Sequence, residues 1–111
     1  MATRFNPVSG VDALDKLLER SQAETVILFN HDPHCPISGR AYAQMEQLGD
    51  DVSLVDVSKE RTLTREIQGK TGIRHESPQV IILRDGKPTW SASHFQITTE
   101  AVQSAANDGP K

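Results

Sequence analysis

The chain has 111 residues with a formal net charge of −3, and 36% of them are hydrophobic and 24% charged. This length fits a single domain over residues 1–111 that can bury a core of its own, and the composition is that of a globular rather than a disordered chain. The mild charge and the lack of a basic run or basic helix face exclude nucleic acid as an expected partner.

Residues 1–7 contain no apolar stretch of the signal-peptide type, and no run reaches the roughly 20 apolar residues of a membrane helix. We therefore expect a cytoplasmic protein with no membrane partner. The single cysteine, Cys35, rules out an internal disulfide and is typical of a reducing compartment.

The first half of the chain alternates between helix and strand patterns. Apolar residues at helical spacing, with charges between them, predict an amphipathic helix at about 10–21. The continuous apolar run at 25–29 is typical of a strand buried on both faces of a mostly parallel sheet. A polar loop at 30–36 leads into a helix predicted at about 36–48.

The same alternation continues in the second half. A second strand is predicted at 52–57, followed by a helix at about 60–69. A loop at 72–78 then precedes a third strand at 79–83. These repeated strand–helix–strand units imply right-handed crossovers and a parallel core.

The chain is expected to close with a hairpin and a helix. Asp85-Gly86 is a strong hairpin signal, so residues 87–91 should pair antiparallel with the third strand. Thr98 or Thr99 can cap a last helix that runs to about 106, and residues 107–111 resemble a frayed, disordered tail. This is the element order of the α/β thioredoxin-like fold with an additional first helix and a central four-stranded mixed sheet flanked by helices, and other small α/β domains share parts of it.

Cys35 stands between the first strand and the second helix, directly before Pro36, and proline is favoured in the first helical turn. Its sulfur should lie near unpaired backbone N–H groups and the positive end of the helix dipole, which stabilise the nucleophilic thiolate. His34, when protonated, would act in the same direction, and Ser38, one turn on, is placed to donate a hydrogen bond to the sulfur. The alternative is an inert buried cysteine, which a polar loop beside a proline disfavours.

Two motifs carry a resemblance to a known family. Cys35-Pro36-Ile37-Ser38 resembles a thioredoxin Cys-x-x-Cys motif with serine in place of the second cysteine. The segment at 72–79, Gly-Ile-Arg-His-Glu-Ser-Pro-Gln, precedes the third strand, where thioredoxin-like proteins carry a cis-proline. Together they resemble the monothiol bacilliredoxins of the YtxJ type, over about residues 11–106. His34 stands where many relatives are expected to have threonine, a departure that leaves the nucleophile in place.

The resemblance implies a thiol–disulfide oxidoreductase that removes bacillithiol, a low-molecular-weight thiol, from oxidised protein cysteines. Bacillithiol would be the co-substrate, S-bacillithiolated proteins the clients, and no bound cofactor is implied. The Cys35 thiolate would attack the mixed disulfide and take up the small thiol, which a second thiol would then release. Ser38 cannot resolve an internal disulfide, so a dithiol mechanism is not expected.

The loop before the third strand is the second part of the implied site. X–Pro bonds in folded proteins are cis in only about 5–6% of cases, so spacing alone favours trans, whereas the resemblance predicts a cis Ser77–Pro78 bond. In this fold the loop faces the thiol, and the Ser77 backbone could pair with an incoming chain. Arg74 and His75 either bind a carboxylate of the small thiol or belong to a solvated loop.

Two other functions stay open at this point. One is a monothiol glutaredoxin-like carrier of an iron–sulfur cluster, which the bulk of Pro36 and Ile37 disfavours. The other is a non-catalytic thioredoxin-like interaction domain in which Cys35 is an ordinary thiol. A metal site is not expected, because His31, His34 and Cys35 are loosely spaced and fewer than the four ligands of a closed zinc site.

Overall fold

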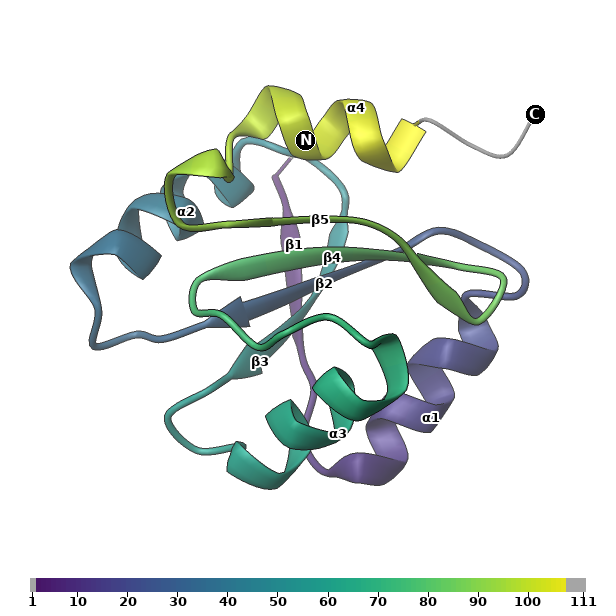
Figure 1. The fold of residues 1–111 in the computed structure, drawn as a ribbon. Coiled ribbons are helices and arrows are strands. Elements are labelled where there is room, and N and C mark those ends of the chain that lie inside the picture. Colours follow the sequence, from purple (N-terminus) through teal and green to yellow (C-terminus); the bar gives the residue numbers. More distant parts are fainter. Residues whose placement is uncertain (1, 108–111) are drawn as a thin grey trace.

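The computed structural model describes residues 2–107. Its helices and strands form three layers, with a twisted sheet between α1 and α3 on one face and α2 and α4 on the other (Figure 1). The elements in chain order are β1 (Arg4–Pro7), α1 (Val11–Arg20), β2 (Val26–His31), α2 (Pro36–Glu46), β3 (Asp51–Asp56), α3 (Arg61–Thr71), β4 (Gln79–Arg84), β5 (Lys87–Ser93), the short 3₁₀ helix η1 (His94–Gln96) and α4 (Thr99–Asn107).

The sheet has five strands in the order β1-β3-β2-β4-β5. The predicted fold class, a mixed sheet flanked by helices, is confirmed, but the expected count of four strands was one too low. The missing strand is β1, at the edge of the sheet, where it pairs in parallel with β3. Its sequence, Arg-Phe-Asn-Pro, has one large apolar side chain and a proline, so it lacks the pattern by which strands are recognised.

The parallel core is also smaller than predicted. β3 is parallel to both β1 and β2, but β4 is antiparallel to β2. The strand–helix–strand pattern predicted a parallel crossover through α3. Instead, residues 72–78 return the chain to the end of the sheet at which β3 finishes. β4 therefore begins beside the end of β2 and runs antiparallel to it.

Several element boundaries differ from the predictions by one or two residues. β2 continues to His31, so Asn30 and His31 lie in a strand rather than in the predicted loop. β5 extends to Ser93. Residue 107, placed in the frayed tail, ends α4, and the rest of that predicted tail, 108–111, lies outside the described residues. The predicted hairpin is confirmed, since Asp85 (φ 54°) and Gly86 (φ 76°) both have the positive φ of a type I′ turn.

Two hydrophobic clusters fill the space between the layers. One lies between the sheet and α2 with α4, and includes Met45 and Val102. The other lies between the sheet and α1 with α3, and includes Leu14 and Ile67. Every residue of β2 is buried, which confirms the prediction for residues 26–29 of the apolar run, whereas Thr25 lies before the strand and is partly buried. This central strand is therefore a rigid support for the loop that follows it.

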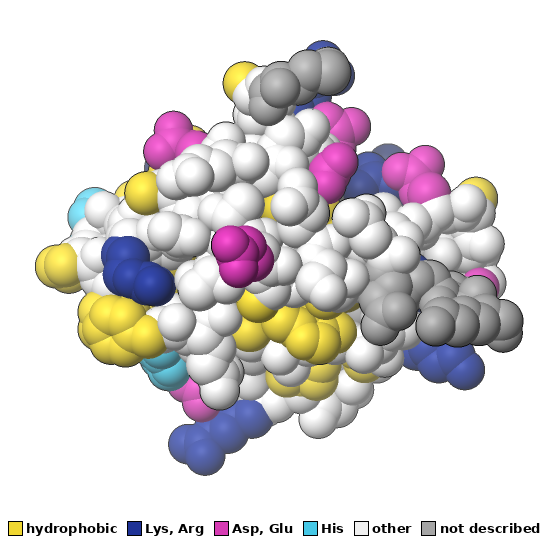
Figure 2. All heavy atoms as spheres, turned by 90° about the horizontal axis from the view of Figure 1, so that it is seen from above, with side chains coloured by type: hydrophobic (Ala, Val, Ile, Leu, Met, Phe, Trp, Pro, Cys, Tyr) yellow, Lys and Arg dark blue, Asp and Glu magenta, His cyan; other side chains and the backbone are white. Residues whose placement is uncertain are grey.

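On the outer surface of the α2–α4 layer, charged side chains of both signs are interspersed. Seen from this side, acidic and basic side chains are scattered around small hydrophobic areas and do not gather by sign (Figure 2). In the described part of the chain, no helix has the length and apolar character needed to cross a membrane.

Candidate active site

Three loops meet at one end of the sheet, where β2 and β3 finish and β4 begins. β2 ends at His31, which pairs with Asp56 at the end of the parallel strand β3. β4 begins at Gln79, which pairs with Asn30 of β2. The loops at 32–35, 57–60 and 72–78 therefore all leave or enter the sheet at the same end. They bring Cys35 to the side of the sheet that holds Ser77 and Pro78.

Cys35 is the N-cap residue of α2, with Pro36 as the first helical residue. The preceding turn is fixed by Asp32, whose side chain accepts a hydrogen bond from the His34 N–H (2.9 Å) and whose carbonyl accepts one from the Cys35 N–H (3.1 Å). The thiol is half-buried and makes no side-chain capping bond to the helix. Because the first N–H groups of a helix lack intrahelical acceptors, they remain available to a thiolate at this position.

Ser38 is fully buried beneath this turn. Its hydroxyl accepts a hydrogen bond from the Asp32 N–H (2.8 Å) and lies 2.7 Å from His31 Nδ1. The expected hydrogen bond to the Cys35 sulfur is not among its contacts, because the side chain points to the end of β2. Ser38 thus shapes the turn that presents the thiol.

The protonation of His31 decides the direction of the Ser38 hydrogen bond. When Nδ1 carries no proton, it accepts the hydroxyl proton of Ser38. When Nδ1 is protonated, it donates to the Ser38 oxygen, and the hydroxyl proton becomes available to another acceptor. Burial lowers the pKa of His31, while Asp56 and Asp32 oppose that shift. Sequence reasoning had placed His31 in a loop and missed this contact.

An aromatic cluster holds the His31 ring. The ring centroid lies 5.2 Å from that of Phe29 and 5.0 Å from that of Tyr42. Tyr42, on α2, also stacks on Phe5 of β1 at 4.4 Å. These contacts join the edge strand, the central strand and the active-site helix beneath Cys35, and they restrict the position of the helix start.

His34 is exposed next to Cys35. Its side chain is close enough to Asp56 to contribute to the lowered pKa of that carboxyl group, although the hydrogen bond from Ser58 is the main cause. The residue therefore lies next to Cys35 in the chain and in contact with solvent. Its effect on the thiol stays a prediction.

The Ser77–Pro78 peptide bond is cis, which confirms the prediction made from the resemblance. The Pro78 carbonyl accepts a hydrogen bond from the His94 N–H (3.0 Å), which ties this loop to η1. The hydroxyl oxygen of Ser77 is buried and has no partner within residues 2–107.

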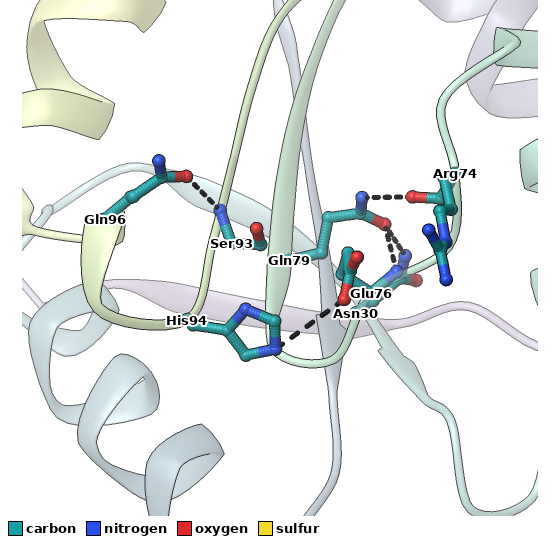
Figure 3. A network of polar contacts seen from close by, with 7 residues as sticks. All are labelled: Asn30, Arg74, Glu76, Gln79, Ser93, His94 and Gln96. Atoms are coloured by element: carbon teal, nitrogen blue, oxygen red, sulfur yellow. Dashed lines mark hydrogen bonds and ion pairs between the residues drawn. The ribbon is translucent and has the colours of Figure 1, made fainter.

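Gln79 connects this loop to the central strand (Figure 3). Its Oε1 accepts hydrogen bonds from Asn30 Nδ2 (3.0 Å) and the Glu76 N–H (3.4 Å). Its Nε2 donates to the Arg74 carbonyl at 2.9 Å. No role for Gln79 was predicted from the sequence, although a glutamine that opens an otherwise apolar strand is a signal for a buried polar contact. Glu76 also faces His94, with 3.7 Å between Oε2 and Nε2.

The two candidate ligand-binding residues of the loop are used differently. Arg74 contributes its backbone carbonyl to the Gln79 contact and has an exposed side chain. His75 is partly buried, and its N–H donates to Gln68 Oε1 of α3 at 2.7 Å. Its Nδ1 is buried without a partner in the described chain. Within residues 2–107, no three His, Cys, Asp or Glu side chains are grouped as metal ligands.

The chain is similar to known proteins over nearly its whole length. The family model described as monothiol bacilliredoxin BrxC matches residues 6–102. A solved structure described as "A putative oxidoreductase with a thioredoxin fold" is 28% identical, with a TM-score of 0.84 over 91% of this chain and 92% of that one.

Thioredoxins show the same fold at lower identity. That of Fasciola hepatica is 13% identical with a TM-score of 0.71, over 91% of this chain and 95% of its own. That of Trypanosoma brucei brucei is 14% identical with a TM-score of 0.74, over 92% of this chain and 87% of its own.

The mixed sheet, the cysteine at the start of α2 and the cis-proline at the same end of the sheet define a thiol–disulfide oxidoreductase of thioredoxin-like fold. The match to the family model covers most of the sequence. The chain therefore belongs to the monothiol bacilliredoxin family.

Proposed function

We propose that this protein removes bacillithiol from S-bacillithiolated client proteins in the cytoplasm, with Cys35 as the nucleophile. The arrangement at the start of α2 carries this proposal. Cys35 is the single thiol of the chain, and the position one turn on is occupied by Ser38, which is buried and already hydrogen-bonded. Disulfide exchange must therefore take place between molecules.

The reaction consists of two exchange steps. The Cys35 thiolate attacks the bacillithiol sulfur of the mixed disulfide, a bond forms between these two sulfurs, and the client cysteine leaves as a thiolate that takes up a proton. A second bacillithiol thiolate then attacks the bacillithiol sulfur held on Cys35. This step releases bacillithiol disulfide and restores the Cys35 thiolate, so electrons and atoms balance without a bound cofactor.

The surrounding residues support these steps in distinct ways. Pro36 fixes the helix start, and the helix terminus stabilises the attacking and departing thiolate of Cys35. His34, when protonated, adds positive charge beside it. The loop that contains Ser77 and Pro78 lies at the same end of the sheet, and we expect the Ser77 backbone to pair there with the client.

The test is exposure of the reduced protein to bacillithiol disulfide, followed by intact-mass measurement. We expect a gain of one bacillithiol on Cys35, its removal by added bacillithiol, and release of a thiol from an S-bacillithiolated client. The Cys35→Ser variant should gain nothing while keeping its circular dichroism spectrum.

An unmodified wild-type protein that leaves the client oxidised would refute the proposed exchange and point to a non-catalytic interaction domain. A purified protein that absorbs visible light and resists the adduct would point instead to an iron–sulfur carrier.

A further inference from the structure

A cavity of about 320 Å³ opens between α3 and the loop that leads to the cis-proline. Most of its lining comes from α3, a helix to which the sequence analysis gave no functional residue. The lining residues are Val57, Arg61, Thr64, Arg65, Gln68 and His75.

This cavity adjoins the end of the sheet where the Cys35 loop leaves β2. Val57 directly follows β3, and its N–H donates to the carbonyl of His31 at 3.0 Å. His75 lies two residues before Ser77 and is fixed to α3 through Gln68. The cavity is thus bounded by one residue bonded to the strand that carries the Cys35 loop and by another from the cis-proline loop.

The charge of the lining is positive. Arg61 and Arg65 are one turn apart on α3 and exposed, and among the described residues no acidic side chain lines the cavity. Across residues 2–107, neither guanidinium group forms a hydrogen bond or an ion pair. This local excess of positive charge occurs in a chain whose net charge is −3. Guanidinium groups bind carboxylates through two parallel hydrogen bonds, so this lining suits a carboxylate-bearing ligand.

His75 adds a neutral polar group to this basic pair. Burial lowers the pKa of His75, with a smaller opposing effect of Glu76. Its Nδ1 is buried and has no partner among residues 2–107, although buried polar atoms in folded proteins nearly always have one. A ligand with oxygen atoms would supply that partner.

We propose that this cavity binds the carboxylate-bearing end of the low-molecular-weight thiol that Cys35 accepts. Arg61 and Arg65 hold its carboxylates, and His75 hydrogen-bonds beside them. The inference rests on the proposed function, and it changes the predicted ligand set, because His75 lines the cavity whereas Arg74 does not. Recognition by α3 would let the enzyme distinguish an anionic small thiol from an uncharged one.

The first experiment compares two disulfide substrates in steady-state exchange. One is a peptide carrying bacillithiol in a mixed disulfide, and the other is 2-hydroxyethyl disulfide, which has no carboxylate. For the double variant Arg61→Gln/Arg65→Gln, we expect the KM of the bacillithiol substrate to rise roughly tenfold or more, the effect of losing one or more charge-assisted hydrogen bonds. Its kcat, and both constants for 2-hydroxyethyl disulfide, should stay within about twofold.

The matched control is Lys16→Gln/Lys87→Gln, which also removes two positive charges. Both lysines are exposed, and neither lines the cavity. This control should behave like the wild type with both substrates. The conservative variant Arg61→Lys/Arg65→Lys should recover part of the lost affinity. If Arg61→Gln/Arg65→Gln and the control Lys16→Gln/Lys87→Gln lose affinity equally, the effect comes from net charge and the cavity proposal is wrong.

A binding measurement separates this proposal from the proposed function. Calorimetric titration of reduced bacillithiol into the Cys35→Ser protein tests the cavity without any exchange chemistry. Heat of binding that is abolished by Arg61→Gln/Arg65→Gln supports the cavity even if the wild type catalyses no exchange. Conversely, normal exchange by the arginine double variant, together with no arginine-dependent binding, overturns the cavity proposal and leaves the proposed function intact.

Discussion

The two ends of the sheet differ in how completely their polar groups are paired. The left end in Figure 1 carries the Cys35 and cis-proline loops, and the right end carries the β4–β5 hairpin and the end of α1. At the hairpin end, Ser21 Oγ donates to the Leu18 carbonyl (2.6 Å) and accepts from the Gly86 N–H (2.9 Å). The Ser21 carbonyl accepts from the Asp85 N–H at 2.8 Å.

Arg84 completes the pairing at the hairpin end. Its side chain is largely buried, donates from Nε to Thr25 Oγ1 at 2.9 Å and also donates to the Ala106 carbonyl. One buried guanidinium therefore joins the end of β4, the start of β2 and the last helix. A buried arginine stabilises a fold only where such partners are present.

The active-site end has the opposite character. Within residues 2–107, every buried side-chain polar atom that has no hydrogen-bond partner lies at this end. These atoms are Asn30 Oδ1, His75 Nδ1 and Ser77 Oγ. Each such atom costs on the order of 1–3 kcal/mol of stability. The comparison teaches that pairing is complete where the chain needs rigidity, and incomplete where substrate groups are expected to bind.

The largest effect on stability is expected from Arg84→Ala. The change removes charge-assisted hydrogen bonds and leaves the Ala106 carbonyl and the Thr25 hydroxyl without their donor. We expect a loss of about 3 kcal/mol in the free energy of unfolding, measured by urea denaturation. Arg84→Lys should lose less, and disulfide exchange by the folded protein should be unchanged. A loss below about 1 kcal/mol would show that the hairpin end does not anchor the fold.

A matched pair of serine substitutions sharpens the comparison. Ser21→Ala leaves the Gly86 N–H without its acceptor and should lower the free energy of unfolding by about 1–3 kcal/mol. Ser77→Ala removes a buried hydroxyl that has no partner in the part of the chain that the structure describes, so stability should stay the same or rise by up to about 1 kcal/mol. The same urea experiment measures both. Equal losses would mean that the Ser77 hydroxyl is paired in solution, and the contrast between the two ends would not hold.

Local chemistry in the sequence predicted much of this arrangement. Pro36 marks the start of α2, and Asp85-Gly86 forms the hairpin, because each depends on the conformational preferences of one or two residues. The cis state of the Ser77–Pro78 bond was available only through the resemblance to a family.

Features that depend on distant partners were missed. β1 is a strand because β3 offers it an open edge, and nothing in Arg4–Pro7 shows this. The contact between His31 and Ser38 required knowing that β2 continues past Phe29. The Arg61, Arg65 and His75 cavity depends on how α3 packs beside the returning loop, which helical periodicity does not encode.

The smallest expected effect is a pH dependence of stability set by the active-site end. Burial lowers the pKa values of His31 and His75 below their usual 6.5, so near and below that pH the unfolded chain binds protons that the folded chain does not. Stability is therefore full above about pH 6.5 and falls as the pH drops toward the folded-state values.

Urea unfolding between about pH 5 and 8 should show this decline, and it should be shallower in His75→Gln, whose substitution removes one of the two groups. A stability that is flat or rises toward pH 5 would mean that both rings are protonated in the folded protein. Ser38 would then accept a hydrogen bond from His31, and its hydroxyl proton would be available to another acceptor.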